Sequence, residues 1–199
     1  TAPYDGMLLS RAMIGEPNHP GKMNESLSMR FRRVGAREHL RLTAKGQLEM
    51  PIFGDNGAFS YCDLPEPPYT AADTVEFYGQ GQFTHGCAVD HIVFEFDKNV
   101  SALNGGNEMS RKRFELTLDL ASEFFEESKV LDSTFTPIGV IQGWSPDSLA
   151  HAAKELVKIG YRYLAIGGMV PLSSLDTHLA VSAVTDAIKQ WPGIKVHLL

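Results

Sequence analysis

PIGVIQGWSPDSLAHAAKELVKIGYRYLAIGG, residues 137–168, carries the clearest structural pattern in the chain. Its two short apolar runs, residues 137–141 and 163–166, each end in polar residues or glycine and predict buried strands. Between them Ser145 is a favourable N-cap, and apolar residues recur at helical spacing until Gly160. Two strands joined by a helix predict a parallel strand pair with a right-handed crossover.

The same plan of strand and helix repeats through most of the chain. Further strands are predicted at four apolar runs, residues 6–14, 50–53, 85–89 and 194–199. Further helices are predicted around residues 70–79, within 111–129, and on the apolar stripe of 175–188. This alternation indicates an α/β protein with about six strand–helix units. It leaves two architectures open, a doubly wound open sheet and a (β/α)8 barrel.

The composition is that of an ordinary globular protein. The 199 residues are 43% hydrophobic and 21% charged, with a net charge of −6, which excludes a disordered, collagen-like or coiled-coil chain. The two cysteines, Cys62 and Cys87, are too few for a disulfide framework and are predicted to be reduced thiols. No apolar run reaches the roughly 18 residues that span a bilayer, so we expect a cytoplasmic protein without a membrane partner.

Polar residues or glycines follow four of the predicted strands: Asp55, Asp90, Gln142 and the pair Gly167-Gly168. The carboxyl ends of parallel strands share one edge of a sheet, where ligand sites are built. Carboxylates can accept from the N1–H and amine of guanine, an amide can meet its O6 oxygen, and glycines leave room for a flat ring. These residues therefore favour a guanine-like ligand, with turn and cap roles as the alternative.

One stretch of this acidic chain is locally basic. Residues 30–45 contain Arg30, Arg32, Arg33, Arg37, Arg41 and Lys45 against the single acidic Glu38. Two interpretations are open. The arginines Arg30, Arg32, Arg33 and Arg37 could contact nucleic-acid phosphates, or the stretch could be a solvated helix face.

Three strand ends resemble motifs of the tRNA-guanine transglycosylases. Residues 55–60, DNGAFS, look like a variant of that family's Asp-Ser-Gly-Gly-Phe-Gln motif. Residues 139–143, GVIQG, and 165–169, AIGGM, are similar to its Gly-Ile-Gln-Gln-Gly and Ala-Val-Gly-Gly-Leu segments, in the same order and with similar separation. The segment 167–172, GGMVPL, looks most like the DNA-modifying branch, which inserts a 7-deazaguanine base into DNA.

The resemblance covers nearly all of the chain and implies a (β/α)8 barrel that catalyses base exchange. A carboxylate attacks the sugar C1′ and displaces guanine, and the incoming 7-deazaguanine then releases the covalent intermediate. The matching positions imply that Asp55 is the catalytic acid and base. The implied substrate-binding residues are Asp90, Gln142 and Gly168 at the base edge, Gly167 at the floor of the pocket, and Phe59 or Met169 on a ring face.

The chain also departs from the family pattern at single positions. Asn56 replaces the usual Ser and Ala58 the usual Gly, which puts the hydrogen bonds of the first motif in doubt. Asp97 is a second candidate for the family's base-binding aspartate, which we match to Asp90 after the third strand.

Two larger parts of the family pattern are not found in residues 1–199, the nucleophilic Asp after a seventh strand and the later cysteine-rich zinc site. We therefore expect one partial barrel domain over residues 1–199 without metal ligands or cofactor of its own, completed by a second chain or a remaining segment. The alternatives to exchange on DNA are the same exchange on tRNA and a non-catalytic base- or nucleic-acid-binding relative that lacks the nucleophile.

Overall fold

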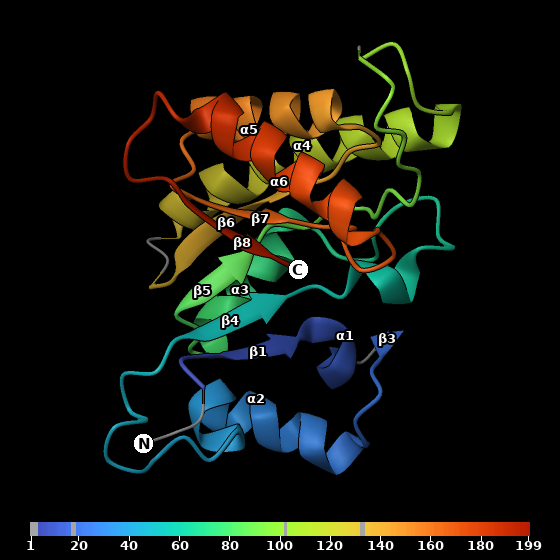
Figure 1. The fold of residues 1–199 in the computed structure, drawn as a ribbon. Coiled ribbons are helices and arrows are strands. Elements are labelled where there is room, and N and C mark those ends of the chain that lie inside the picture. Colours follow the sequence, from blue (N-terminus) through green and yellow to red (C-terminus); the bar gives the residue numbers. More distant parts are fainter. Residues whose placement is uncertain (1–3, 17–18, 102, 132–133) are drawn as a thin grey trace.

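The computed structural model describes residues 4–16, 19–101, 103–131 and 134–199 (Figure 1). One sheet of six parallel strands has the order β1-β4-β5-β6-β7-β8. Its strands are β1 (Met7–Ser10), β4 (Ile52–Asp55), β5 (His85–Cys87), β6 (Thr136–Ile141), β7 (Tyr163–Ile166) and β8 (Lys195–Leu198). Two short strands, β2 (Gly15–Glu16) and β3 (His19–Pro20), form a separate antiparallel pair.

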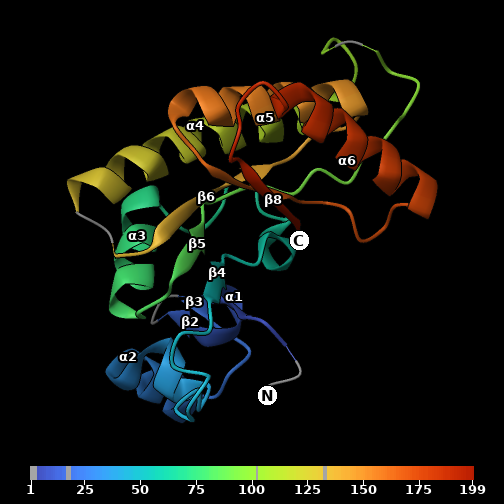
Figure 2. The same cartoon turned by 60° about the vertical axis from the view of Figure 1, so that its left-hand side comes forward.

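The strand order decides between the two predicted architectures. Each strand of the main sheet lies beside the one that precedes it in the chain, with no reversal of order. A doubly wound sheet has such a reversal, whereas a barrel is wound in one direction. Figure 2 shows the sheet curling around an open concave side with the helices outside it. The prediction of an incomplete (β/α)8 barrel with about six units is therefore confirmed.

Helices cover the convex side of the sheet (Figure 1). They are α2 (Glu25–His39), α3 (Ala71–Gln80), α4 (Glu108–Val130), α5 (Pro146–Ile159) and α6 (Ser174–Ile188). The short helix α1 (Arg11–Ile14) and the 3-10 helix η1 (Ala58–Tyr61) instead follow the carboxyl ends of β1 and β4. The four predicted helices correspond to α3, α4, α5 and α6. The α5 helix begins where expected because Ser145 and Ser148 form a reciprocal capping box. Within the described ranges, none of the helices combines the length and apolarity that crossing a membrane requires.

Alternate strand residues face opposite sides of the sheet and form two apolar layers. The larger layer, between the sheet and the helices, includes Ile52, Leu164 and Ile166. The smaller layer on the concave side consists of Cys87, Ile138, Val140 and Ala165, with Phe53 and Tyr163 packed against it. Asp55 lies two residues after Phe53, so the alternation places it on the concave side as well.

One predicted strand needs correction. The strand predicted over residues 6–14 ends at Ser10, and the helix α1 starts at the next residue. The apolar run continues through this helix because Ile14 is buried, and Arg11 is buried as well. The Arg11 guanidinium donates to Thr74 Oγ1 at 2.6 Å and lies 4.0 Å from the Tyr69 ring centre. The strand predicted over residues 163–166 has the observed bounds, and the bounds of the others are shifted by one or two residues.

Candidate functional site

Four neighbouring strands, β4 to β7, deliver the predicted site residues to one edge of the sheet. Asp55 is the last residue of β4, Asp90 follows β5 by three residues, and Gln142 and Gly167 come directly after β6 and β7. The strands are adjacent and parallel, so these ends converge. Direct contact confirms that two of them meet, because Gln142 Nε2 donates to Asp90 Oδ2 at 2.7 Å.

The Asp90 carboxyl and the Gln142 amide are both buried, with exposed fractions of 4% and 3%. Gln142 uses its oxygen as well, because Oε1 accepts from Val93 N at 3.1 Å. These two bonds fix the orientation of the amide. Burial, and then the charge of Asp55, raise the pKa of Asp90 to about 7, while the bond from Gln142 acts in the opposite direction.

Asp55 is held in a turn whose backbone requires glycine. Its Oδ2 accepts from Gly57 N at 2.9 Å, and the Ser10 side chain forms a further hydrogen bond with its carboxyl. Gly57 has φ 76°, and a Cβ there would lie 2.6 Å from both Ala12 Cβ and Ser10 Oγ. Burial outweighs these bonds and raises the pKa of Asp55. Two neighbouring carboxyls with raised pKa values are typical of a site that exchanges protons near neutral pH.

Asn56 connects the ends of β4 and β5. Its Nδ2 donates to Cys87 O at 3.0 Å and to Ala88 O at 3.2 Å, two residues before Asp90. The sequence identified Asn56 only as a departure from the family motif. A polar residue directly after a strand was the available signal for this bridging role, but the partner could not be predicted from it.

The two glycines after β7 make room for other groups of the site. A Cβ on Gly167 would lie 2.4 Å from Gln142 Nε2, so the space that this glycine leaves is filled by the Gln142 amide. Gly168 has φ 73°, and a Cβ there would lie 3.1 Å from Val93 O. Both positions therefore require glycine on steric grounds.

The two residues predicted to pack on a ring face differ in exposure. Phe59 in η1 is 73% exposed and meets Phe94 edge-on, with ring centres 6.1 Å apart. Met169 is 7% exposed and belongs to the core between the sheet and the helices. Asp97, the competitor of Asp90, is exposed and accepts from Asn99 N in a local turn.

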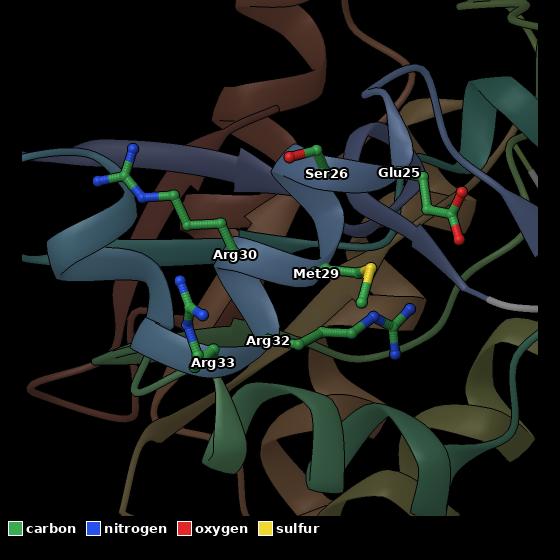
Figure 3. Close-up of a pocket in the computed structure, with 6 residues that line it drawn as sticks. All are labelled: Glu25, Ser26, Met29, Arg30, Arg32 and Arg33. Carbon is green, nitrogen blue, oxygen red and sulfur yellow. The ribbon is translucent and has the colours of Figure 1, made fainter.

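Four arginines of the basic stretch, Arg30, Arg32, Arg33 and Arg37, lie on α2, whereas Arg41 and Lys45 follow the end of this helix. The four arginines on α2 divide into two pairs. Arg37 donates to Gln47 O at 2.7 Å and to Met50 O at 2.8 Å, and Arg32 donates to Gly15 O at 2.6 Å, so both side chains brace neighbouring backbone. The pocket of about 900 Å³ on this helix is lined by Arg30, Arg32 and Arg33, together with Glu25, Ser26 and Met29. In Figure 3 the guanidinium groups of Arg30 and Arg33 extend to one side and that of Arg32 to the other.

In the part of the chain that the structure describes, no three His, Cys, Asp or Glu side chains are grouped so as to hold a metal ion. These residues do not fit the cysteine-rich zinc site that the resemblance implies.

The raised pKa of Asp90 predicts how its replacement changes stability with pH. The folded protein binds the proton of Asp90 more tightly than the unfolded chain does. The protonated carboxyl therefore contributes fully to the free energy of unfolding below pH 3.8, and this contribution is lost as the pH rises to about 7. We expect Asp90→Asn to unfold like the wild type near pH 4 and to be more stable at pH 8, by up to about 4 kcal/mol. Urea unfolding at both pH values measures this difference. The exposed Asp119→Asn on α4 is the control, and an equal response of the two variants would contradict the burial effect.

Comparison with known proteins identifies a relative of this chain. No protein-family model matches the chain. A protein from Salmonella montevideo named DNA-guanine transglycosylase is 34% identical over 199 residues, which cover 99% of this chain and 46% of that protein. The chain therefore spans about half the length of the curated relative that it matches.

Proposed function

We propose that the chain belongs to the guanine transglycosylase superfamily, in its DNA-modifying branch, and that it contributes the base-recognising part of an enzyme that exchanges guanine in DNA for a 7-deazaguanine derivative. The observation that carries this proposal is the hydrogen-bonded pair of Asp90 and Gln142 beside Asp55 at one sheet edge. A pentosyltransferase of this kind needs a site that reads a guanine edge and a group that moves its proton.

Asp90 and Gln142 are the proposed readers of the base. The Asp90 carboxylate accepts from the N1–H and the exocyclic amine of guanine, two donors that adenine does not present together. Gln142 has a second amide N–H besides the one bonded to Asp90, and this donor suits the O6 oxygen. Since Gln142 is held by Val93 and by Asp90, its donor is oriented before the base arrives.

Asp55 is the proposed acid and base. Because its pKa is raised, the Asp55 carboxyl stays protonated to a higher pH than the carboxyl of an ordinary aspartate. In the exchange it protonates the departing guanine and later removes the proton from the incoming 7-deazaguanine. The resemblance assigns the attack on C1′ to a different aspartate after a seventh strand, so Asp55 is not given that role. A further segment or a second chain would supply this strand and its neighbour.

The proposed location is the cytoplasm. The described cysteines, Cys62 and Cys87, are unpaired, as expected in a reducing compartment that also contains DNA.

Incorporation of labelled 7-deazaguanine tests the function and its alternatives. The protein that contains this chain is incubated with the labelled base and either double-stranded DNA or tRNA. Label in DNA alone supports the proposal, whereas label in tRNA alone would transfer the activity to tRNA. Binding of the free base without incorporation or a trapped covalent DNA adduct would instead indicate a non-catalytic base-binding protein.

Arg30 and Arg33 are the proposed DNA contacts on α2, because Arg32 and Arg37 are bonded to backbone carbonyls. We expect the double substitution Arg30→Gln and Arg33→Gln to weaken DNA binding without changing affinity for the free base. Each lost phosphate contact lowers the slope of log K against log salt by about 0.9, so the slope should fall by about 2. Fluorescence anisotropy at several salt concentrations measures it. The exposed Lys189→Gln, at the end of α6, should leave the slope unchanged.

A further inference from the structure

The segment that carries Asp90 has no regular secondary structure. Residues 88–97 follow β5 without helix or strand. Backbone hydrogen bonds hold its two ends, from Ala88 N to Ile138 O at 2.8 Å and from Asp97 N to Trp144 O at 2.8 Å. Between those ends lies Asp90, whose carboxyl must be placed accurately if it is to read a base edge.

Side chains from other elements hold the middle of this segment. The backbone N–H of His91 donates to Thr117 Oγ1 at 3.0 Å, and Tyr61 Oη donates to Asp90 O at 3.1 Å. Two residues after Asp90, the backbone carbonyl of Ile92 accepts from Arg113 Nη1 at 2.9 Å. The position of the Asp90 backbone therefore depends on side-chain donors and acceptors rather than on a strand ladder.

Arg113 differs from the other supports because it holds two loops at once. Its Nη1 donates to Ile92 O, and its Nη2 donates to Cys62 O at 2.5 Å. Cys62 is the residue directly after η1, the short helix that carries Phe59. The planar guanidinium presents both donors in one rigid fork, which a lysine ammonium cannot reproduce.

The neighbouring turn of the same helix supports this geometry. Arg113 and Thr117 are four residues apart on α4, and residues at this spacing lie on one face of a helix. Thr117 accepts from the N–H of His91, and Arg113 donates to the carbonyl of Ile92. Together they hold the backbone on both sides of the peptide bond between His91 and Ile92. The α4 face therefore serves as a fixed support behind the site.

We propose that Arg113 is a positioning residue that sets the placement of Asp90 relative to the η1 loop, and thereby the fit of the base between them. The inference rests on the proposed function, because base recognition gives this placement its purpose. The hydrogen bonds that the described residues form with the Arg113 side chain go to backbone carbonyls in these two loops, so we give Arg113 no part in the proton transfer.

Arg113→Lys tests the proposal, since it keeps the charge and removes the fork. Arg111→Lys is the matched control, because Arg111 is exposed on the same helix. The readouts are the titration midpoint of the Asp90 carboxyl by NMR and the affinity for 7-deazaguanine by calorimetry. For Arg113→Lys we expect the midpoint to fall by about one pH unit from its wild-type value, as water reaches the loosened segment, and Kd to rise about tenfold. The control should change neither.

Equal midpoints and equal affinities in the two variants would overturn the positioning role. A wild-type protein that binds no 7-deazaguanine would overturn the proposed function, while the Asp90 midpoint would still decide the role of Arg113. If Arg113→Lys does not fold, Arg113→Gln, which keeps a neutral N–H donor toward one carbonyl, replaces it with the same expected direction.

Discussion

Asn in place of Asp55 should lower the rate of guanine exchange by about a thousandfold while the protein stays folded. The substitution keeps the shape of the side chain and the bond from Gly57 N, but the amide cannot take up and release the proton of the base. The fold should be retained because burial already disfavours the charged form of this carboxyl. Label exchange and thermal unfolding, measured on the same preparation, test both parts.

The control for this substitution is Asp63→Asn, an exposed loop position close in sequence. It should leave exchange and melting temperature unchanged. A drop of many degrees in the melting temperature of Asp55→Asn would identify Asp55 as a structural residue instead. Normal exchange in that variant would remove it from the chemistry altogether.

Gly167→Ala should have the second large effect, on base binding. The added Cβ would lie 2.4 Å from Gln142 Nε2, so the Gln142 amide must move and give up its bond to Asp90. The amide oxygen then also leaves the Val93 N–H without its partner. We expect the affinity for 7-deazaguanine to fall about a hundredfold, as measured by calorimetry.

Gly79→Ala is the matched control, because a Cβ on this helical glycine would meet nothing within 4 Å. It should bind the base normally and stabilise the protein by roughly 0.5–1 kcal/mol, since alanine favours the helix. If Gly167→Ala also bound the base normally, the amide of Gln142 would not be part of the base site.

The sequence predicted the strand ends well because their signal is local. Each apolar run stops where a polar residue or glycine begins, so Asp90, Gln142 and Gly167 could be assigned to one edge before any contact was known. The contact of Asp90 with Gln142 confirms that this edge brings them together. The catalytic and binding roles of these residues, and the single domain over residues 1–199, stay predictions.

The partners of individual side chains could not be predicted, because they depend on distant parts of the chain. Arg37 and Phe59 both matched simple patterns, one as a basic residue in a basic stretch and the other as a motif aromatic. In the fold Arg37 donates to Gln47 O and Met50 O, whereas Phe59 is exposed and meets only the edge of Phe94 among described rings. Arg113, the support behind the site, has no sequence signal of its own.

Calorimetry of 7-deazaguanine and 7-deazahypoxanthine, each at pH 6 and pH 8, tests base recognition by Asp90 most directly. The second base lacks only the exocyclic amine, so the wild type should bind 7-deazaguanine about a hundredfold more tightly at pH 8. Because the pKa of Asp90 is about 7 and the carboxylate is the binding form, 7-deazaguanine affinity should rise about tenfold from pH 6 to pH 8. Equal affinity for the two bases, or affinity that does not change with pH, would contradict recognition of guanine by this carboxyl.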